Sequence, residues 1–185
     1  IQKLKVTQVA IIMGLLILAD MWTVDKRYLN ADHFVTQREF NSQYKLRPAD
    51  NAILTDKDPN YRVLDLSVDV FNDSHTSYFH KTIGGYSAAK LQRYQDMIDY
   101  FIIPEIQNLG NALKQSPTLS AIEGSLSQQK ALNMLNAKYI IIDPNSAPIN
   151  NRFVYGNAWF VKDYELVDTP DDEIITLKQI DPKES

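Results

Sequence analysis

The chain has 185 residues, a formal net charge of −4 and 44% hydrophobic residues, which is ordinary usage for one globular domain with a real core. The charges are scattered and no basic stripe is interleaved with aromatic residues, so the composition argues against a nucleic-acid-binding protein. Cysteine is absent, which excludes disulfides and thiolate metal sites but leaves the redox compartment open.

The first expected element is an apolar helix over residues 1–20. Lys3 and Lys5 precede residues 6–19, a run that is almost entirely apolar. This run is too short to cross a bilayer, which takes about 20 residues. It therefore fits a buried core helix, a signal-peptide core, or the outer half of a transmembrane helix that begins before Ile1. Lysines before the run and acids after it favour the transmembrane helix, with its start in the cytoplasm and the following residues outside the cytoplasm. No small-residue cleavage site is evident, which argues against a signal peptide.

After this helix, the sequence predicts a single α/β domain over residues 21–185. A short helix is expected from Pro48 onward, and the partial alternation of apolar residues over 61–68 predicts a buried strand. Ser87 is the expected N-cap of an amphipathic helix. Pro104 falls inside that helix and predicts a kink or a break, because proline lacks a backbone donor.

The second half of the domain adds the rest of the predicted sheet. A helix over 127–136 runs directly into a strand over 138–143, which is apolar on both faces and therefore expected to be central. Residues 150–151 mark a loop, and 158–167 predict a further strand or hairpin. Thr169, followed by proline and three acids, predicts a helix start. The predicted fold is mixed α+β: a small mixed β-sheet flanked by helices, with an apolar N-terminal helix.

Candidate functional residues concentrate between the first strand and the long helix, in residues 73–87. Loops that leave a strand and enter a helix are where α/β proteins place polar function. The candidate ligand-binding residues are Asp73, His75, Tyr78, His80, Lys81, Gly84, Gly85, Tyr86 and Arg93.

The carboxylate and two imidazoles of this set could ligate zinc, or an imidazole could move a proton. However, the spacing of Asp73, His75 and His80 matches no standard ligand set on a helix. The competing interpretation is that these side chains hydrogen-bond an irregular loop. No metal site is therefore assigned.

The aromatic residues of the loop, with Lys81 and Arg93 nearby, suit the apolar faces and hydroxyl edges of sugar rings, although such aromatics are also common in cores. Gly84-Gly85 before a helix is compatible with an anion cradle. The pair lacks the spacing of dinucleotide and P-loop motifs, so a tight turn with positive φ is the alternative. The chain has no Gly-x-Ser-x-Gly, no His-Glu-x-x-His and no cysteine nucleophile, so it does not support a self-contained hydrolase.

Eight short segments, spread in order over residues 20–181, carry a family resemblance. They are residues 20–22, 61–64, 71–73, 77–81, 83–86, 90–94, 132–140 and 156–161. In this order they resemble the large extracytoplasmic region of the YfhO-like bacterial multi-pass membrane proteins, a family that is similar to the C-type glycosyltransferases.

The resemblance implies a polytopic membrane protein that uses polyprenyl-phosphate-linked sugar to decorate cell-envelope polymers. In that superfamily the catalytic acids lie in an early extracytoplasmic loop, and no position here matches it. We therefore expect a non-catalytic domain on the extracytoplasmic (periplasmic) side of the cell membrane. Its implied partners are the membrane and a polyprenyl-phosphate sugar or envelope glycan, with no cofactor and no nucleic acid.

Two other functions stay open. One is a ligand-binding or assembly module of a membrane protein that has no transferase activity. The other is a soluble metal-dependent enzyme built on Asp73, His75 and His80.

Overall fold

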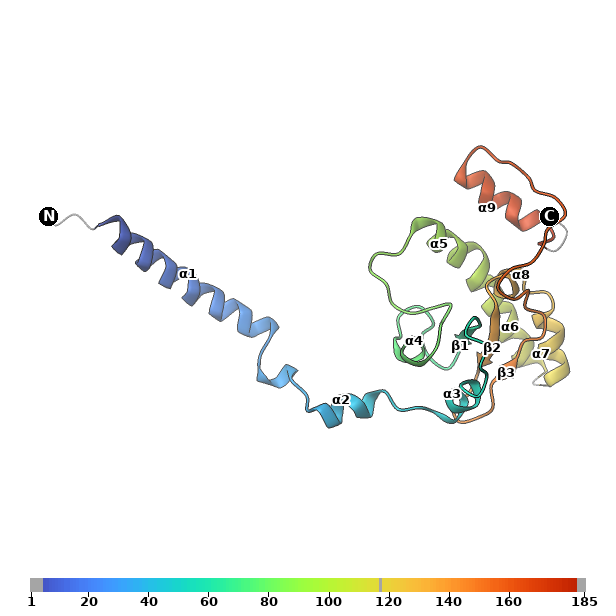
Figure 1. Ribbon diagram of the computed structural model, residues 1–185, viewed down its shortest axis with the longest axis horizontal. Coiled ribbons are helices and arrows are strands. Elements are labelled where there is room, and N and C mark those ends of the chain that lie inside the picture. The colour runs from blue at the N-terminus through green and yellow to red at the C-terminus, as the bar shows by residue number, and fades with distance from the viewer. Residues whose placement is uncertain (1–4, 117, 183–185) are drawn as a thin grey trace. The chain divides into compact units, whose positions relative to one another are not determined.

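The computed structural model describes residues 5–116 and 118–182 and divides the chain into two units, residues 1–45 and 46–185 (Figure 1). The N-terminal unit contains α1 (Val6–Tyr28), a 3-10 turn (Ala31–His33) and α2 (Gln37–Gln43).

Helix α1 is the expected apolar helix, but it runs beyond residue 20 to Tyr28. With 23 residues and a rise of about 1.5 Å per residue, it measures about 35 Å. None of its residues is buried. Within the described residues it is the one helix that is long and apolar enough to cross a membrane.

The compact unit is built on a three-stranded sheet in the order β1-β2-β3. The strands are β1 (Arg62–Asp65), β2 (Ala137–Ile141) and β3 (Ile149–Asn150). β1 runs parallel to β2, whereas β3 is antiparallel to it. The prediction of a small mixed sheet with a central strand near residue 140 is therefore confirmed. The expected loop at 150–151 is partly wrong, because Asn150 pairs with Tyr139.

Helices flank this sheet, as predicted. The helical segments described in the compact unit are, in chain order, α3 (Pro48–Ile53), α4 (His75–Phe79), α5 (Gln92–Met97), a π-helical turn (Ile98–Ile102), α6 (Ile103–Gln115), α7 (Leu119–Leu126), α8 (Lys130–Met134) and α9 (Pro170–Gln179).

Two hydrophobic cores lie on opposite faces of the sheet, because successive residues of a strand point to opposite sides. Leu64 and Ile140 pack into a large core with the π-helical turn and helices α6 to α8. Their neighbours Val63 and Ile141 pack into a smaller core that includes Ile53 of α3. The central strand is thus covered on both sides.

Some predicted boundaries are wrong in identifiable ways. The long helix starts at Gln92 with Leu91 as its N-cap, so the prediction of Ser87 as its cap is wrong. The sequence predicts a kink or a break at Pro104, but residues 92–115 stay helical without a break. The helix instead changes to a π-helical turn just before α6, and Pro104 lies in the first turn of α6. The helix expected over 127–136 is only α8, and Asn136 leaves it with a positive φ of 58°.

The C-terminal segments give one correction and one confirmation. Residues 158–167 form neither strand nor helix, so the predicted hairpin is wrong. By contrast, α9 begins as predicted, because the Oγ1 of Thr169 accepts a hydrogen bond from the backbone N–H of Asp172 at 3.1 Å.

Candidate functional site

The segment 73–87 is more ordered than an irregular loop. It contains α4, and its later part runs beside β1 as a single bridge between Thr82 and Val63. The backbone N–H of Val63 donates to the carbonyl of Lys81 at 2.8 Å, and that of Ile83 donates to the carbonyl of Val63 at 3.2 Å. This pairing fixes residues 81–83 against the edge of the sheet.

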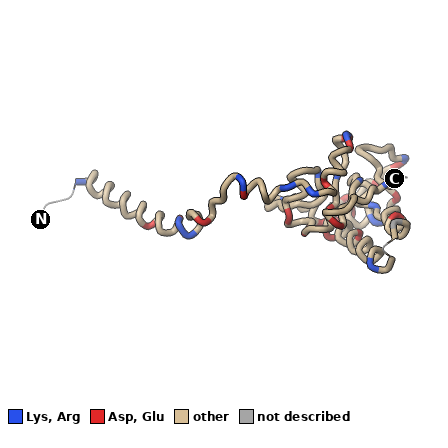
Figure 2. Tube along the Cα trace, turned by 90° about the horizontal axis from the view of Figure 1, so that it is seen from below, with Lys and Arg blue, Asp and Glu red and all other residues tan. Residues whose placement is uncertain are grey.

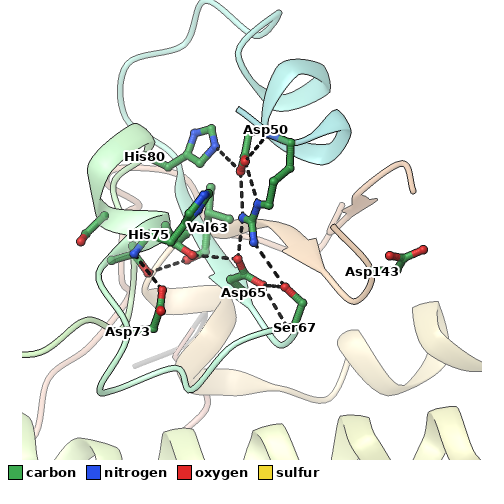
Figure 3. Close-up of polar contacts among 12 residues, drawn as sticks. Asp50, Val63, Asp65, Ser67, Asp73, His75, His80 and Asp143 are labelled. Carbon is green, nitrogen blue, oxygen red and sulfur yellow. Dashed lines mark hydrogen bonds and ion pairs between the residues drawn. The ribbon is translucent and has the colours of Figure 1, made fainter. Parts of the chain in front are cut away.

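A buried polar network lies where β1, α3 and α4 meet (Figure 3). Arg47, the N-cap of α3, donates from Nε and Nη2 to the two carboxylate oxygens of Asp50, at 2.8 and 2.9 Å. Its Nη2 also donates to Asp65, the last residue of β1, at 2.7 Å. Asp65 further accepts hydrogen bonds from the hydroxyls of Ser67 and Thr76. One guanidinium therefore joins two buried carboxylates.

The charges in this network stabilise one another. Burial alone raises the pKa of Asp50, but the hydrogen bonds and charge of Arg47 outweigh it, so the net pKa is lowered. Burial also raises the pKa of Asp65, and the hydrogen bonds from Ser67, Thr76 and Arg47 bring it below its usual value. The carboxylates in turn raise the pKa of Arg47, chiefly through the hydrogen bonds to Asp50. All three groups are charged at neutral pH.

The candidate residue His80 belongs to this network. Its Nε2 lies 3.1 Å from Oδ1 of Asp50, and because a carboxylate only accepts, Nε2 is the donor. Both side chains are buried, and Nδ1 of His80 has no hydrogen-bond partner among residues 5–116 and 118–182. Burial lowers the pKa of His80, which favours the neutral ring. His80 is therefore a structural residue that joins the end of α4 to α3.

A lowered histidine pKa predicts a specific loss of stability in mild acid. Below the unfolded pKa of about 6.5, the unfolded chain binds a proton that the folded His80 takes up only at lower pH. Stability from His80 is thus fully present above about pH 6.5 and falls as the pH drops toward the folded pKa. In urea denaturation between about pH 7 and pH 5, His80→Gln should show a shallower decline than the unmodified chain.

The matched control for this experiment is His33→Gln, which changes an exposed histidine in the N-terminal unit. It should leave the pH dependence of the compact unit unchanged. Equal slopes for His80→Gln and the unmodified chain would show that His80 does not titrate as its burial requires.

The residues proposed as zinc ligands do not converge. His80 points to Asp50, whereas the Asp73 carboxylate accepts a hydrogen bond from the backbone N–H of His75 at 2.7 Å (Figure 3). No group of three His, Cys, Asp or Glu residues that could hold a metal ion occurs in the described part of the chain. The interpretation as polar residues that order the loop accounts for Asp73 and His80.

The glycine pair is a tight turn rather than an anion cradle. The N–H of Gly84 donates to the Oγ1 of Thr82 at 3.1 Å, and the N–H of Gly85 donates to the carbonyl of Val70 at 2.7 Å. Neither donor is left for a phosphate, and the next helix begins only at Gln92. Gly85 has a φ of 98°, as the turn interpretation requires.

The other candidates are on the surface. Tyr78 and Tyr86 are 60% and 71% exposed. Lys81 donates from Nζ to the carbonyl of Pro59 at 2.6 Å. Arg93 forms an exposed ion pair with Glu173 of α9 at 3.2 Å.

Two adjoining hollows lie beside these residues. The first, here called the loop pocket, has a volume of about 250 Å³. It is lined by Phe71, Ile83, Gly84, Gly85, Ser87, Ala89, Lys90, Leu91 and Tyr94. The second, here called the helix groove, lies between α5 and α9 and has a volume of about 340 Å³. Leu91 and Tyr94 line both hollows, so the two adjoin.

The hollows bring together only part of the predicted set. Gly84 and Gly85 line the loop pocket and Arg93 lines the helix groove, each with mainly apolar neighbours. Lys90, which the sequence did not single out, lies at the loop pocket with Nζ 5.4 Å from the ring centre of Phe71. A cation above an apolar floor can bind a ligand with a flat apolar face and an anionic or hydroxyl edge.

Sequence reasoning missed the network that holds His80, namely its partner Asp50 together with Arg47 and Asp65. One local signal was available, since an aspartate in an otherwise apolar strand requires a partner. Compared with known proteins, the chain matches no family model, no curated protein and no solved structure.

Proposed function

We propose that this chain is a membrane-anchored accessory domain on the extracytoplasmic side of a polytopic cell-membrane protein that transfers sugar from a lipid-linked donor to a cell-envelope polymer. In this proposal α1 crosses the membrane, and the compact unit from Leu46 onward acts outside it without performing catalysis. The transferase activity rests on the resemblance to the YfhO-like family described above.

The observation that carries the membrane location is the exposure of α1. The helix has 23 residues and an apolar sequence, and the N-terminal unit to which it belongs buries none of them. Its length of about 35 Å slightly exceeds the hydrocarbon core of a bilayer, about 30 Å. Lys26 and Arg27 in its last turn lie where long basic side chains reach the headgroups.

The non-catalytic role is supported by the state of the titratable groups. Asp50, Asp65 and His80 are buried and form hydrogen bonds within the network that includes Arg47. None of them lines the loop pocket or the helix groove. What remains accessible is the loop pocket with Lys90 and the adjoining groove with Arg93. We assign to this pair of hollows the contact with the glycan or with the sugar phosphate of the donor.

The experiment uses intact cells and single cysteines introduced into this chain, which contains no cysteine of its own. Lys57→Cys, an exposed position in the compact unit, should react with a membrane-impermeant maleimide, whereas Gln2→Cys should react only after lysis. In the same protein, Lys90→Ala with Arg93→Ala should lower sugar transfer from the lipid-linked donor several-fold, because the cations that hold the ligand are lost. Lys57→Ala is the matched control and should leave transfer unchanged.

Labelling of both cysteines before lysis, or of neither, would contradict the proposed orientation. Absence of lipid-linked sugar consumption by the unmodified protein would leave the alternative, a ligand-binding or assembly module without transferase activity. The exposed apolar side chains of residues 158–167 favour that alternative, since Phe160 is fully exposed and Leu166 is 86% exposed.

A further inference from the structure

The segment that follows α1 is rich in exposed apolar side chains. Tyr28, Leu29, Phe34, Val35 and Phe40 lie within 13 residues and all are exposed, Phe34 to 70%. Together with Trp22 near the end of α1, they are here called the collar. No residue of α1, the 3-10 turn or α2 is buried, so the N-terminal unit does not cover the collar itself.

The collar belongs to a segment with local order rather than to a structureless linker. The side chain of Asn30 accepts a hydrogen bond from the N–H of Asp32 at 2.9 Å and caps the 3-10 turn. Thr36 and Glu39 form a reciprocal capping box at the start of α2, with hydrogen bonds of 3.3 and 2.8 Å. The caps give the free backbone N–H groups at the start of these two helical turns a hydrogen-bond partner within the segment. An amphipathic segment needs such local partners when its apolar side chains leave water.

The charge of this segment also differs from that of the chain. Residues 22–44 hold three Lys and Arg and three Asp and Glu, so their charges balance, whereas the whole chain has a net charge of −4 (Figure 2). Lys26 lies with Nζ 5.4 Å from the ring centre of Trp22. Aromatic rings beside basic side chains at the end of an apolar helix are typical of the lipid–water interface.

We propose that residues 22–44 lie in the lipid–water interface of the membrane, with the collar inserted among the headgroups and its basic residues on lipid phosphates. The inference rests on the proposed function, which places α1 across the membrane. The membrane is favoured over a protein partner because the collar is continuous with α1. Its first residues lie on α1, and the others follow within the next few turns. An open hollow between α1 and the 3-10 turn, lined by Trp22, Leu29 and Phe34 among others, offers space for a headgroup.

The test reconstitutes the full chain in vesicles of phosphatidylethanolamine and phosphatidylglycerol, with single cysteines carrying an environment-sensitive fluorophore. Labels at Phe34→Cys and Phe40→Cys should brighten several-fold on reconstitution and be quenched by lipids that carry a quencher near the headgroup. Ser42→Cys is the matched control, because it lies about 200° around α2 from Phe40. It should stay as bright and as water-accessible as a label at Lys57→Cys in the compact unit.

A label at Leu15→Cys in the middle of α1 tests the membrane anchor separately from the position of the collar. If it is quenched by deep lipid quenchers while positions 34 and 40 behave like position 42, the interface assignment is wrong and the membrane anchor stands. If Leu15→Cys is not quenched, the anchor itself is wrong. Shielding of positions 34 and 40 without quenching by lipid would show that protein covers the collar, which also overturns the inference.

A second measurement leaves the collar unchanged. The chain has two tryptophans, so Trp159→Phe makes Trp22 the only one. Its emission should shift to shorter wavelength in vesicles and be quenched by headgroup-level quenchers more strongly than by deep ones. Emission typical of water would contradict the proposal.

Discussion

Arg47→Met is expected to lower the free energy of unfolding of the compact unit by about 3–5 kcal/mol, the usual effect of breaking a buried ion pair. The two carboxylates that Arg47 contacts, Asp50 and Asp65, are 0% and 2% exposed. Removing the guanidinium leaves both of them buried without their cation, and neither can be rehydrated without opening the packing of α3 on the sheet. Urea denaturation of the full chain in mild detergent, followed by circular dichroism, measures the loss.

The control and the rescue identify the cause. Arg152→Met changes an exposed arginine and should alter stability by no more than about 0.5 kcal/mol. Adding Asp50→Asn and Asp65→Asn to Arg47→Met removes the unpaired charges, so the triple variant should be more stable than the sum of the separate losses predicts. A strictly additive result would mean that lost side-chain packing, rather than unpaired charge, destabilises the single variant.

Signals that act over a few residues predicted the structure well. Thr169 and the N–H that it caps are three residues apart, so the start of α9 could be predicted from a short stretch of sequence. The π-helical turn before Pro104 has an equally local reason, since the missing donor and the ring of proline affect only the preceding turn. The apolar run near residue 140 likewise identified the central strand, because only a strand covered on both faces needs that composition.

Features that depend on distant partners were missed or wrong. Asp50 contacts His80, which is 30 residues away, so the local sequence carries no signal that these two residues are partners. Residues 158–167 have the alternation of a strand, but a strand forms only beside another strand, and this segment pairs with none. Its Trp159 instead donates from the ring nitrogen to the carbonyl of Pro182 at 2.7 Å.

In the candidate site, too, local features could be predicted and features that depend on distant residues could not. The glycine pair was recognised as important, and its turn geometry was one of the two interpretations that the sequence allowed. The loop pocket beside it could not be predicted, because it also needs Phe71 from before α4 and Tyr94 from α5. The backbone contact that makes Gly84 necessary comes from Val70, fourteen residues earlier, and nothing in the local sequence indicates it.

Gly84→Ala is expected to destabilise the compact unit by about 3 kcal/mol or more, at the upper end of single substitutions. A Cβ at Gly84 would overlap the carbonyl oxygen of Val70, which is backbone and cannot turn aside as a side chain would. That same carbonyl accepts the hydrogen bond from Gly85, so moving it away also weakens the turn. Thermal and urea denaturation of the full chain give the loss directly.

Two other glycines separate the possible causes of this loss. Gly85→Ala meets only ordinary contacts but must keep a φ of 98°, so it should cost about 1–2 kcal/mol from backbone strain alone. Gly110→Ala, in α6 with nothing within 4 Å of its Cβ, should stabilise the chain by about 0.5–1 kcal/mol, because alanine favours helix. The expected order of stability is therefore Gly110→Ala above the unmodified chain, then Gly85→Ala, then Gly84→Ala. If Gly84→Ala were tolerated as well as Gly110→Ala, residues 70 and 84 would not be in contact, and the wall of the loop pocket would have to be placed elsewhere.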